Sequence, residues 1–174
     1  MTNKERYLYL EMLEIKKQLA TIEEDFKSVH ELECTIEAVR NGYTDYYDLN
    51  EQELSEEKDS KWTGFILDVL EMYSHMINSI QNDQRPPYNH TIDDVKFPGF
   101  NGNNEDEEKR FVEFFIIKLS RYAEIEDINK GDYNSQTETS AAYRRMLDKY
   151  NDLGKPVLLN DDEISELLNA YYLK

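Results

Sequence analysis

The chain has 174 residues, with 37 Asp or Glu against 20 Lys or Arg, so its formal net charge is −17. Such a surface repels phosphate, which argues against binding the backbone of a nucleic acid and against docking on an anionic membrane. No apolar run reaches the roughly 20 residues that cross a bilayer, and the one cysteine, Cys34, cannot form an internal disulfide. We therefore expect a cytoplasmic protein without a nucleic-acid or membrane partner.

Glycine and proline are scarce, at 6 and 4 residues, while aromatic residues make up 12% of the chain. Few turn residues favour helices over a β fold, and the aromatic content favours a packed core over a disordered acidic chain. The composition predicts an all-α fold: one multihelical domain over residues 1–174, with about six or seven helices.

The first predicted helix begins at a capping box formed by Thr2 and Glu5, and a second box at Ser28 and Glu31 predicts a break near residues 26–28. Apolar residues recur along it with alternating spacings of four and three, at Leu8, Met12, Ile15, Leu19, Ile22, Phe26 and Val29. This stripe fits a core helix of a bundle or a coiled-coil contact with a second copy. We favour the core helix, because coiled coils usually extend over more heptads.

A second helix is expected to end at Asn41-Gly42, and a wide apolar stripe from Trp62 to Ile80 predicts the central helix. Prolines and glycines exclude helix from residues 82–103, which are predicted to form a long ordered loop. The loop is expected to be pinned to the core by three apolar anchors, Val95, Phe97 and Phe100.

Three further helices are predicted towards the C-terminus. One begins at an Asn104/Glu107 cap and carries an apolar stripe that runs to Tyr122. Another begins near Thr137, and the last begins at the cap formed by Asn160 and Glu163.

Short segments along nearly the whole chain together resemble the YfbU family of small bacterial proteins. In chain order these are Thr2-Asn3 with Arg6, Arg40 with Gly42-Tyr43, Glu71-Met72-Tyr73, Val95, Phe97, Gly99-Phe100, Arg121-Tyr122, Asn134 with Gln136-Thr137, Tyr143 with Arg145-Met146-Leu147, and Glu163-Ile164 with Asn169-Ala170. The resemblance implies an all-helical protein without an established activity. Some members carry a DNA-binding region, which suggests a ligand-binding role for the domain. We expect no such appended region in this chain, which is also more acidic than the family pattern.

One candidate site lies on the polar face of the predicted central helix. Asp68, Glu71 and His75 stand at i, i+3 and i+7, so they share that face and could form a carboxylate–histidine metal site. A solvated polar face explains the same pattern and is favoured. Arg121 and Arg145 are the candidate ion-pair partners of Glu71.

A second candidate is a site for an anionic ligand, because fixed cations, amides and hydroxyls suit such a ligand. Its residues are Arg121, Tyr122, Asn134 and Gln136, with Arg145 and Glu71. Helix capping and an internal salt bridge explain these residues as well, and we favour that explanation.

A third candidate is the pair Arg85 and His90, whose spacing occurs in some helical ribonucleases, although two prolines separate them here. The sequence carries no phosphate-binding, dinucleotide or metalloprotease motif. We therefore predict a non-catalytic interaction or regulatory protein that associates with itself, binds protein partners and needs no cofactor. The alternatives are a domain that binds an anionic metabolite, a weak nuclease or metal-dependent hydrolase, and an acidic mimic of nucleic acid.

Overall fold

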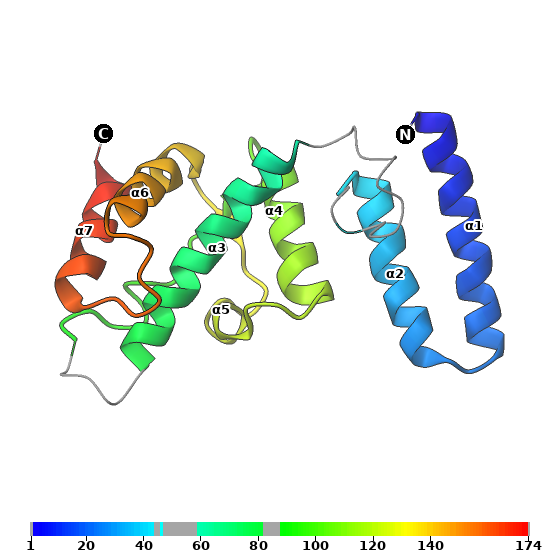
Figure 1. Cartoon of the computed structure of the whole chain (residues 1–174), viewed down its shortest axis with the longest axis horizontal. Helices are drawn as coiled ribbons and strands as arrows, with labels where there is room; N and C mark the ends of the chain where they lie inside the picture. Colours follow the sequence, from blue (N-terminus) through cyan, green and yellow to red (C-terminus); the bar gives the residue numbers. More distant parts are fainter. Residues whose placement is uncertain (1, 44–45, 47–58, 82–87, 174) are drawn as a thin grey trace. The chain divides into compact units, whose positions relative to one another are not determined.

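The structure is a computed structural model that describes residues 2–43, 46, 59–81 and 88–173. Helices dominate the described residues, which confirms the predicted all-α class (Figure 1). Their bounds are α1 Asn3–Ile22, α2 Phe26–Asn41, α3 Ser60–Gln81, α4 Asp106–Glu113, α5 Ala123–Asn129, α6 Ser140–Asp152 and α7 Asp161–Tyr172, with a π-helical segment η2 at Phe114–Lys118 and two-residue strands β1 Phe100–Asn101 and β2 Asn134–Ser135. The chain divides into two compact units, Met1–Gly64 and Phe65–Lys174.

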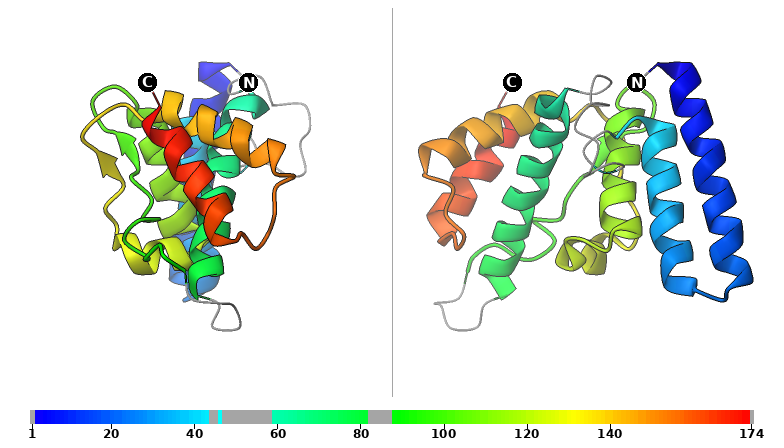
Figure 2. Two further views of the ribbon diagram at one scale, coloured as in Figure 1. Left: turned by 90° about the vertical axis from the view of Figure 1, so that its left-hand side faces the viewer. Right: turned by 45° about the vertical axis from the view of Figure 1, so that its right-hand side comes forward.

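In the first unit, α1 and α2 form an antiparallel hairpin (Figures 1 and 2). The predicted capping box is confirmed at Thr2, whose hydroxyl accepts from the Glu5 backbone N–H while the Glu5 carboxylate accepts from the Thr2 N–H. The second cap lies earlier than expected, because the Asp25 carboxylate accepts the Ser28 backbone N–H. Gly42 ends α2 in the left-handed conformation, at φ 74°, as predicted.

The two sides of α1 have different environments. Leu13 and Ala20 are buried where α1 packs along α2, and Arg40 of α2 pairs with Glu14 of α1 at 3.5 Å. At 100° per residue, the predicted stripe lies on the opposite side of α1 from Leu13 and Ala20. That side is exposed to solvent, so the expectation that the stripe is a core face is wrong: the hairpin uses the other side of α1 for its own packing.

The second unit is built around α3 and a cluster of aromatic rings. Tyr73 of α3 contacts Phe97 edge-on, with ring centroids 5.1 Å apart, and Phe97 stacks on Tyr143 of α6 at 5.8 Å. α6 in turn packs on α7, as the left view of Figure 2 shows. Aromatic pairs of this kind add to the stabilisation that comes from burying their area.

The described part of the predicted loop, residues 88–103, is held down as expected. Val95, Phe97 and Phe100 are fully buried. Thr139 and Tyr143 donate hydroxyl hydrogen bonds to the backbone oxygen of Gly99, at 2.9 and 2.7 Å. Phe100 then pairs in parallel with Asn134, which forms the small sheet that the sequence did not predict.

The helix predicted to run through Tyr122 ends earlier. After α4 the chain widens into η2, where the Leu119 N–H reaches back five residues to the Phe114 oxygen at 3.1 Å. Ser120 and Tyr122 follow with positive φ values of 51° and 53°, and α5 begins at Ala123. Left-handed backbone at two non-glycine residues breaks the helix between η2 and α5.

Candidate functional site

The polar face of α3 meets two tyrosines of the second unit. Tyr150 of α6 hydrogen-bonds His75 Nδ1 through its hydroxyl at 2.5 Å, and Lys155 Nζ lies 3.3 Å from Asp68 Oδ1. Burial raises the pKa of Tyr150 to about 12, with further contributions from the charges of Glu71 and Asp68. The same three causes, together with Glu124, raise the pKa of Tyr122 to about 12. Both phenols are therefore protonated at neutral pH and lie in a negative electrostatic environment.

This cluster does not form the metal site considered from the sequence. Within the described ranges, no group of three His, Cys, Asp or Glu side chains is arranged to hold a metal ion. Asp68 and His75 instead have protein partners, Lys155 and Tyr150. The i, i+3, i+7 spacing placed three side chains on one face but did not bring their donor atoms together.

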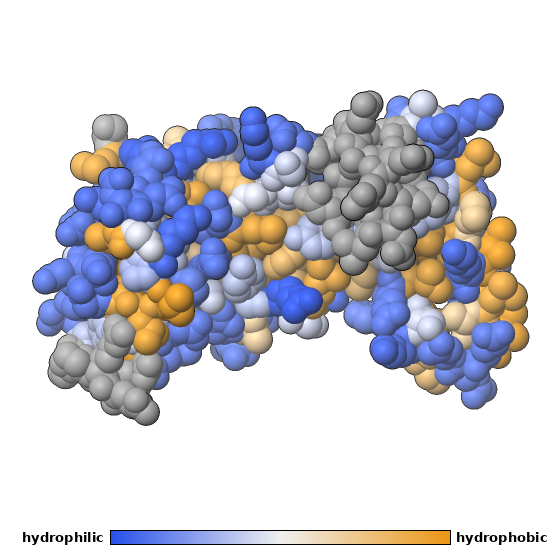
Figure 3. Space-filling model, in the orientation of Figure 1, coloured by the Kyte–Doolittle hydropathy of each residue, from blue (hydrophilic) through white to orange (hydrophobic). Residues whose placement is uncertain are grey.

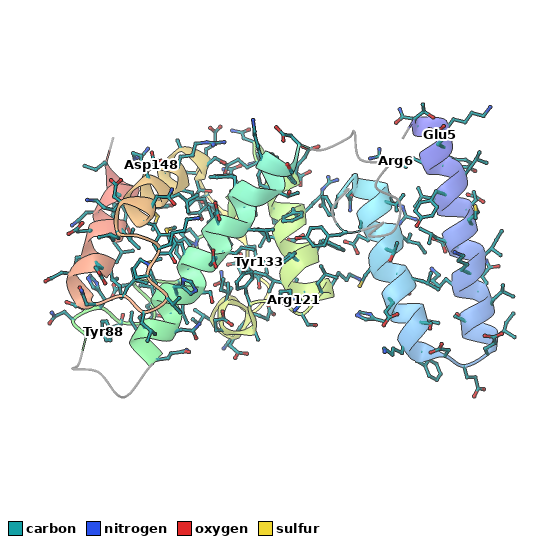
Figure 4. The ribbon with its side chains drawn as sticks, viewed as in Figure 1. Glu5, Arg6, Tyr88, Arg121, Tyr133 and Asp148 are labelled. Carbon is teal, nitrogen blue, oxygen red and sulfur yellow. The ribbon has the colours of Figure 1, made fainter. Side chains whose placement is uncertain are left out.

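Neither arginine suggested as a partner of Glu71 forms an ion pair with it among the described residues. Arg145 is engaged by backbone oxygens: Nε donates to Ala170 at 3.1 Å, Nη2 to Tyr171 at 3.0 Å, and Nη1 to Ala141 at 3.1 Å. Two of these oxygens belong to the last turn of α7, so Arg145 caps the C-terminal end of that helix. Arg121 is exposed in the loop between η2 and α5 (Figure 4).

Among the described residues, no side-chain hydrogen bond or ion pair joins two of the predicted anionic-ligand residues. Asn134 accepts the backbone N–H of Gly102 at 3.0 Å, and Gln136 is exposed ahead of α6. Glu71 is one of the negative charges that raise the pKa of Tyr122, so the charge near that phenol opposes an anion. The most direct support for the anionic-metabolite alternative is therefore missing.

The third candidate pair is described only in part, because Arg85 lies outside the described residues. His90 Nε2 hydrogen-bonds the Ser165 hydroxyl at 2.7 Å, and the carboxylate of Asp161 accepts the Asn89 N–H at 2.8 Å. With the Tyr88 hydroxyl on the Leu159 oxygen at 2.7 Å, these contacts attach the loop to the start of α7. His90 thus has a structural explanation.

The buried carboxylate of Glu105, which is 7% exposed, was not among the site residues predicted from the sequence. It accepts backbone N–H groups of Asn101 at 3.0 Å, Thr139 at 2.9 Å and Ser140 at 2.7 Å. Burial raises the pKa of Glu105, but these hydrogen bonds outweigh burial and the pKa is lowered. The alternating polar residues Asn101, Asn103 and Glu105 were the available signal in the sequence. In the structure the Glu105 carboxylate binds the backbone N–H groups at the start of α6 and so acts as a clamp on it.

A shallow hollow lies beside the break between η2 and α5. Its Glu126 carboxylate already accepts the hydroxyl of Tyr133, whose side chain Figure 4 labels. The other lining residues are Ile116, Ile117, Ser120, Ala123 and Asp127. The hollow includes none of the site residues predicted from the sequence.

Among the described residues of the first unit, exposed apolar side chains lie along α1 in the α1 stripe, defined here as Leu8, Met12, Ile15, Leu19 and Ile22. Ile15 and Leu19 are 57% and 55% exposed, and Ile22 is 77% exposed. Figure 3 shows apolar residues along the outer edge of α1. Tyr7 and Phe26 extend the apolar surface at its two ends. In the described part of the chain, no helix is long and apolar enough to span a membrane, so the stripe is no part of such a helix.

Comparisons with known proteins address the family. A model of the YfbU domain matches residues 1–170, which takes in both compact units. UPF0304 protein MJECS11 of Methanocaldococcus jannaschii is 28% identical over 153 residues, covering 83% of this chain and 88% of that protein. No solved structure matches. The family resemblance noted in the sequence is confirmed, and the chain belongs to the YfbU family.

Proposed function

We propose that this protein is a non-catalytic interaction protein that associates with a second copy of itself through the α1 stripe. The observation that carries the proposal is the exposure of five apolar residues on the side of α1 that faces away from α2. Large contiguous apolar patches on a polar protein mark interaction sites. This chain is otherwise strongly polar, with a mean hydropathy of −0.81, so the stripe stands out from its surface.

The size of the surface suits a dimer. α1 has 20 residues, so at 1.5 Å per residue it is about 30 Å long. The stripe with Tyr7 and Phe26 offers on the order of 700 Å² of exposed apolar area, close to the roughly 800 Å² that each partner contributes to a stable interface. Pairing two such surfaces would bury most of the stripe, with the two α2 helices on the outside.

The spacing of the stripe favours a second copy as the partner. Intervals of four, three, four and three place the residues at successive d and a positions of a heptad repeat. Such a surface is complementary to itself, because side chains of one helix fit between those of an identical helix. Two chains of charge −17 repel each other at a distance, so the attraction must come from this local contact.

Sedimentation of the full chain tests the proposal, at 150 mM salt to screen the long-range repulsion. The test variant is Ile15→Lys/Leu19→Lys, which places two charges in the stripe. The matched control is Asn3→Lys/Thr21→Lys, which adds the same charge to exposed positions of the same helix away from the stripe and its flanks. We expect dimers of the natural chain and of the control, and monomers of the test variant.

Two results would contradict the proposal. One is a natural chain that remains monomeric at millimolar concentration. The other is loss of the dimer in the control and the test variant alike. Thermal unfolding adds a check when it is done at a protein concentration at which the natural chain is also monomeric, so that association does not contribute to stability. A large loss of stability in the test variant would then mean that the stripe is covered within the same chain rather than by a second copy.

A further inference from the structure

We infer that the two copies of α1 pair parallel and in register, with Glu11 of each chain opposite Lys16 of the other. This inference rests on the proposed function and specifies the partner's orientation at the same surface. It starts from the charged residues beside the α1 stripe. Glu11 and Lys16 flank the stripe on opposite sides, and among the described residues neither side chain has a hydrogen bond or ion pair within its own chain.

The heptad positions make the two charges complementary in a parallel pair. With Leu8, Ile15 and Ile22 at d and Met12 and Leu19 at a, Glu11 occupies a g position and Lys16 the e position five residues later. In a parallel coiled coil a g residue lies beside the e residue of the following heptad of its partner. Symmetry therefore supplies two Glu11–Lys16 pairs, and all five residues of the stripe meet their own counterparts.

The antiparallel arrangements are less favourable. One that keeps Ile22 in the interface, opposite Met12, places Lys16 beside Lys16 of the other copy. Sliding the helices by one heptad avoids that repulsion but puts Ile22 opposite Glu5. The Glu5 carboxylate is already bound to the Thr2 N–H at 2.7 Å and cannot turn away without breaking the helix cap. Like charges and buried unpaired carboxylates both act against a pairing.

Disulfide cross-linking distinguishes the orientations. The natural cysteine, which is buried in α2, is first removed as Cys34→Ala. In that background the Met12→Cys and Ile15→Cys chains are each oxidised alone. The Ile15→Cys chains are then oxidised in a mixture with Leu19→Cys chains and, separately, in a mixture with Met12→Cys chains. Parallel pairing in register predicts that the Met12→Cys and Ile15→Cys chains each cross-link to themselves. An antiparallel pair that keeps Ile22 in the interface predicts cross-links only between the Ile15→Cys and Leu19→Cys chains; the shifted one joins Met12→Cys to Ile15→Cys chains.

A charge-reversal cycle gives an independent measure. Glu11→Lys places lysine beside Lys16 in two symmetric positions, and surface pairs of this kind predict a dimer about fivefold weaker at low salt. The double variant Glu11→Lys/Lys16→Glu should restore the natural affinity. Failure of the double variant to recover, together with cross-linking only in mixed samples, would overturn the parallel arrangement while the dimer itself remained. Absence of any dimer would overturn the proposed function and this inference together.

Discussion

The carboxylate of Glu105 accepts a hydrogen bond from the backbone N–H of Ser140 at 2.7 Å, although 35 positions separate the two residues. It also accepts the Thr139 N–H, so one side chain closes the start of α6 and holds α4 beside it. An anion at a helix N-terminus satisfies donors that have no partner within the helix and interacts favourably with the helix dipole.

Replacing this carboxylate should destabilise the fold. Glu105→Ala leaves buried N–H groups without acceptors, and we expect a loss of about 2–3 kcal/mol in the free energy of unfolding. Urea denaturation measures the change. The control is Asp148→Asn, which removes a charge from an exposed position of α6 and should change the free energy by less than about 0.5 kcal/mol. Equal effects of the two variants would contradict the clamp.

The same carboxylate should produce a defined acid dependence. The folded-state pKa of Glu105 lies below its value in the unfolded chain, because hydrogen bonds from Ser140, Asn101 and Thr139 outweigh burial. Its contribution is therefore complete above the unfolded pKa and is lost as the pH falls through the folded one. The free energy of unfolding of Glu105→Gln should fall less steeply than that of the natural chain below about pH 4.5. Parallel curves would show that other groups set the acid response.

Tyr150 should contribute to the loss of stability at alkaline pH. Its pKa is raised to about 12, first by burial and then by Glu71 and Asp68. The contribution is complete below the ordinary tyrosine pKa of about 10 and is lost as the pH rises through 12. Tyr150→Phe loses the hydrogen bond to His75, which should cost about 1 kcal/mol at pH 7. The difference between the two proteins should shrink above pH 10; a constant difference to pH 12 would argue against a buried phenol.

Arg145→Lys should loosen the end of α7. Lysine retains the charge but cannot reach the three backbone oxygens that the guanidinium binds. We expect faster hydrogen exchange in the last turn of α7 and a loss of about 1–2 kcal/mol in the free energy of unfolding. Arg144→Lys is the matched control, since Arg144 is exposed and lies over the Phe65 ring. Unchanged exchange in α7 would contradict the capping role.

Gly99 and Gly131 have nearly equal positive φ angles, so substituting each allows the cost of backbone strain to be compared with the cost of a steric clash. A Cβ at Gly99 would lie 2.1 Å from the Tyr133 backbone oxygen, whereas one at Gly131 would meet nothing within 4 Å. Gly131→Ala should cost about 1 kcal/mol, the price of a positive φ. Gly99→Ala must also separate β1 from β2 and should cost more than about 3 kcal/mol. Similar unfolding temperatures of the two variants would refute this difference.

Local signals predicted much of the fold. The caps at Thr2 and Asn160 involve residues three apart, so the sequence contains both partners. The predicted cap of α2 was misplaced because Asp25 and Ser28 both have side-chain oxygens that can cap a helix. In the structure the Asp25 carboxylate accepts the hydrogen bond from the backbone N–H of Ser28. The prediction that Phe97 and Phe100 anchor the loop is confirmed, because both rings are buried. So polar a chain offers few other places to bury large rings.

The site could be predicted only in part, because its contacts join residues far apart in the sequence. The spacing of Glu71 and His75 gave their shared face, but the approach of Tyr150 depends on how α6 packs. Arg145 suggested a salt bridge, but two of the three oxygens it binds belong to another helix, 25 and 26 residues away. For α1, periodicity identified an apolar side but could not tell which side α2 covers.

The π-helical turn at Phe114–Lys118 holds one residue more than an α-helical turn would. Removing a single residue there should restore ordinary α-helix and rotate everything that follows by roughly 100° about the axis. Tyr122 would then move relative to the charge of Glu71, which contributes to its raised pKa, while Phe111, ahead of the turn, would stay in the core. The extra residue thus sets how the residues after η2 are rotated about the helix axis. A length change in η2 should therefore disturb the α3 polar face more than a substitution at the same position.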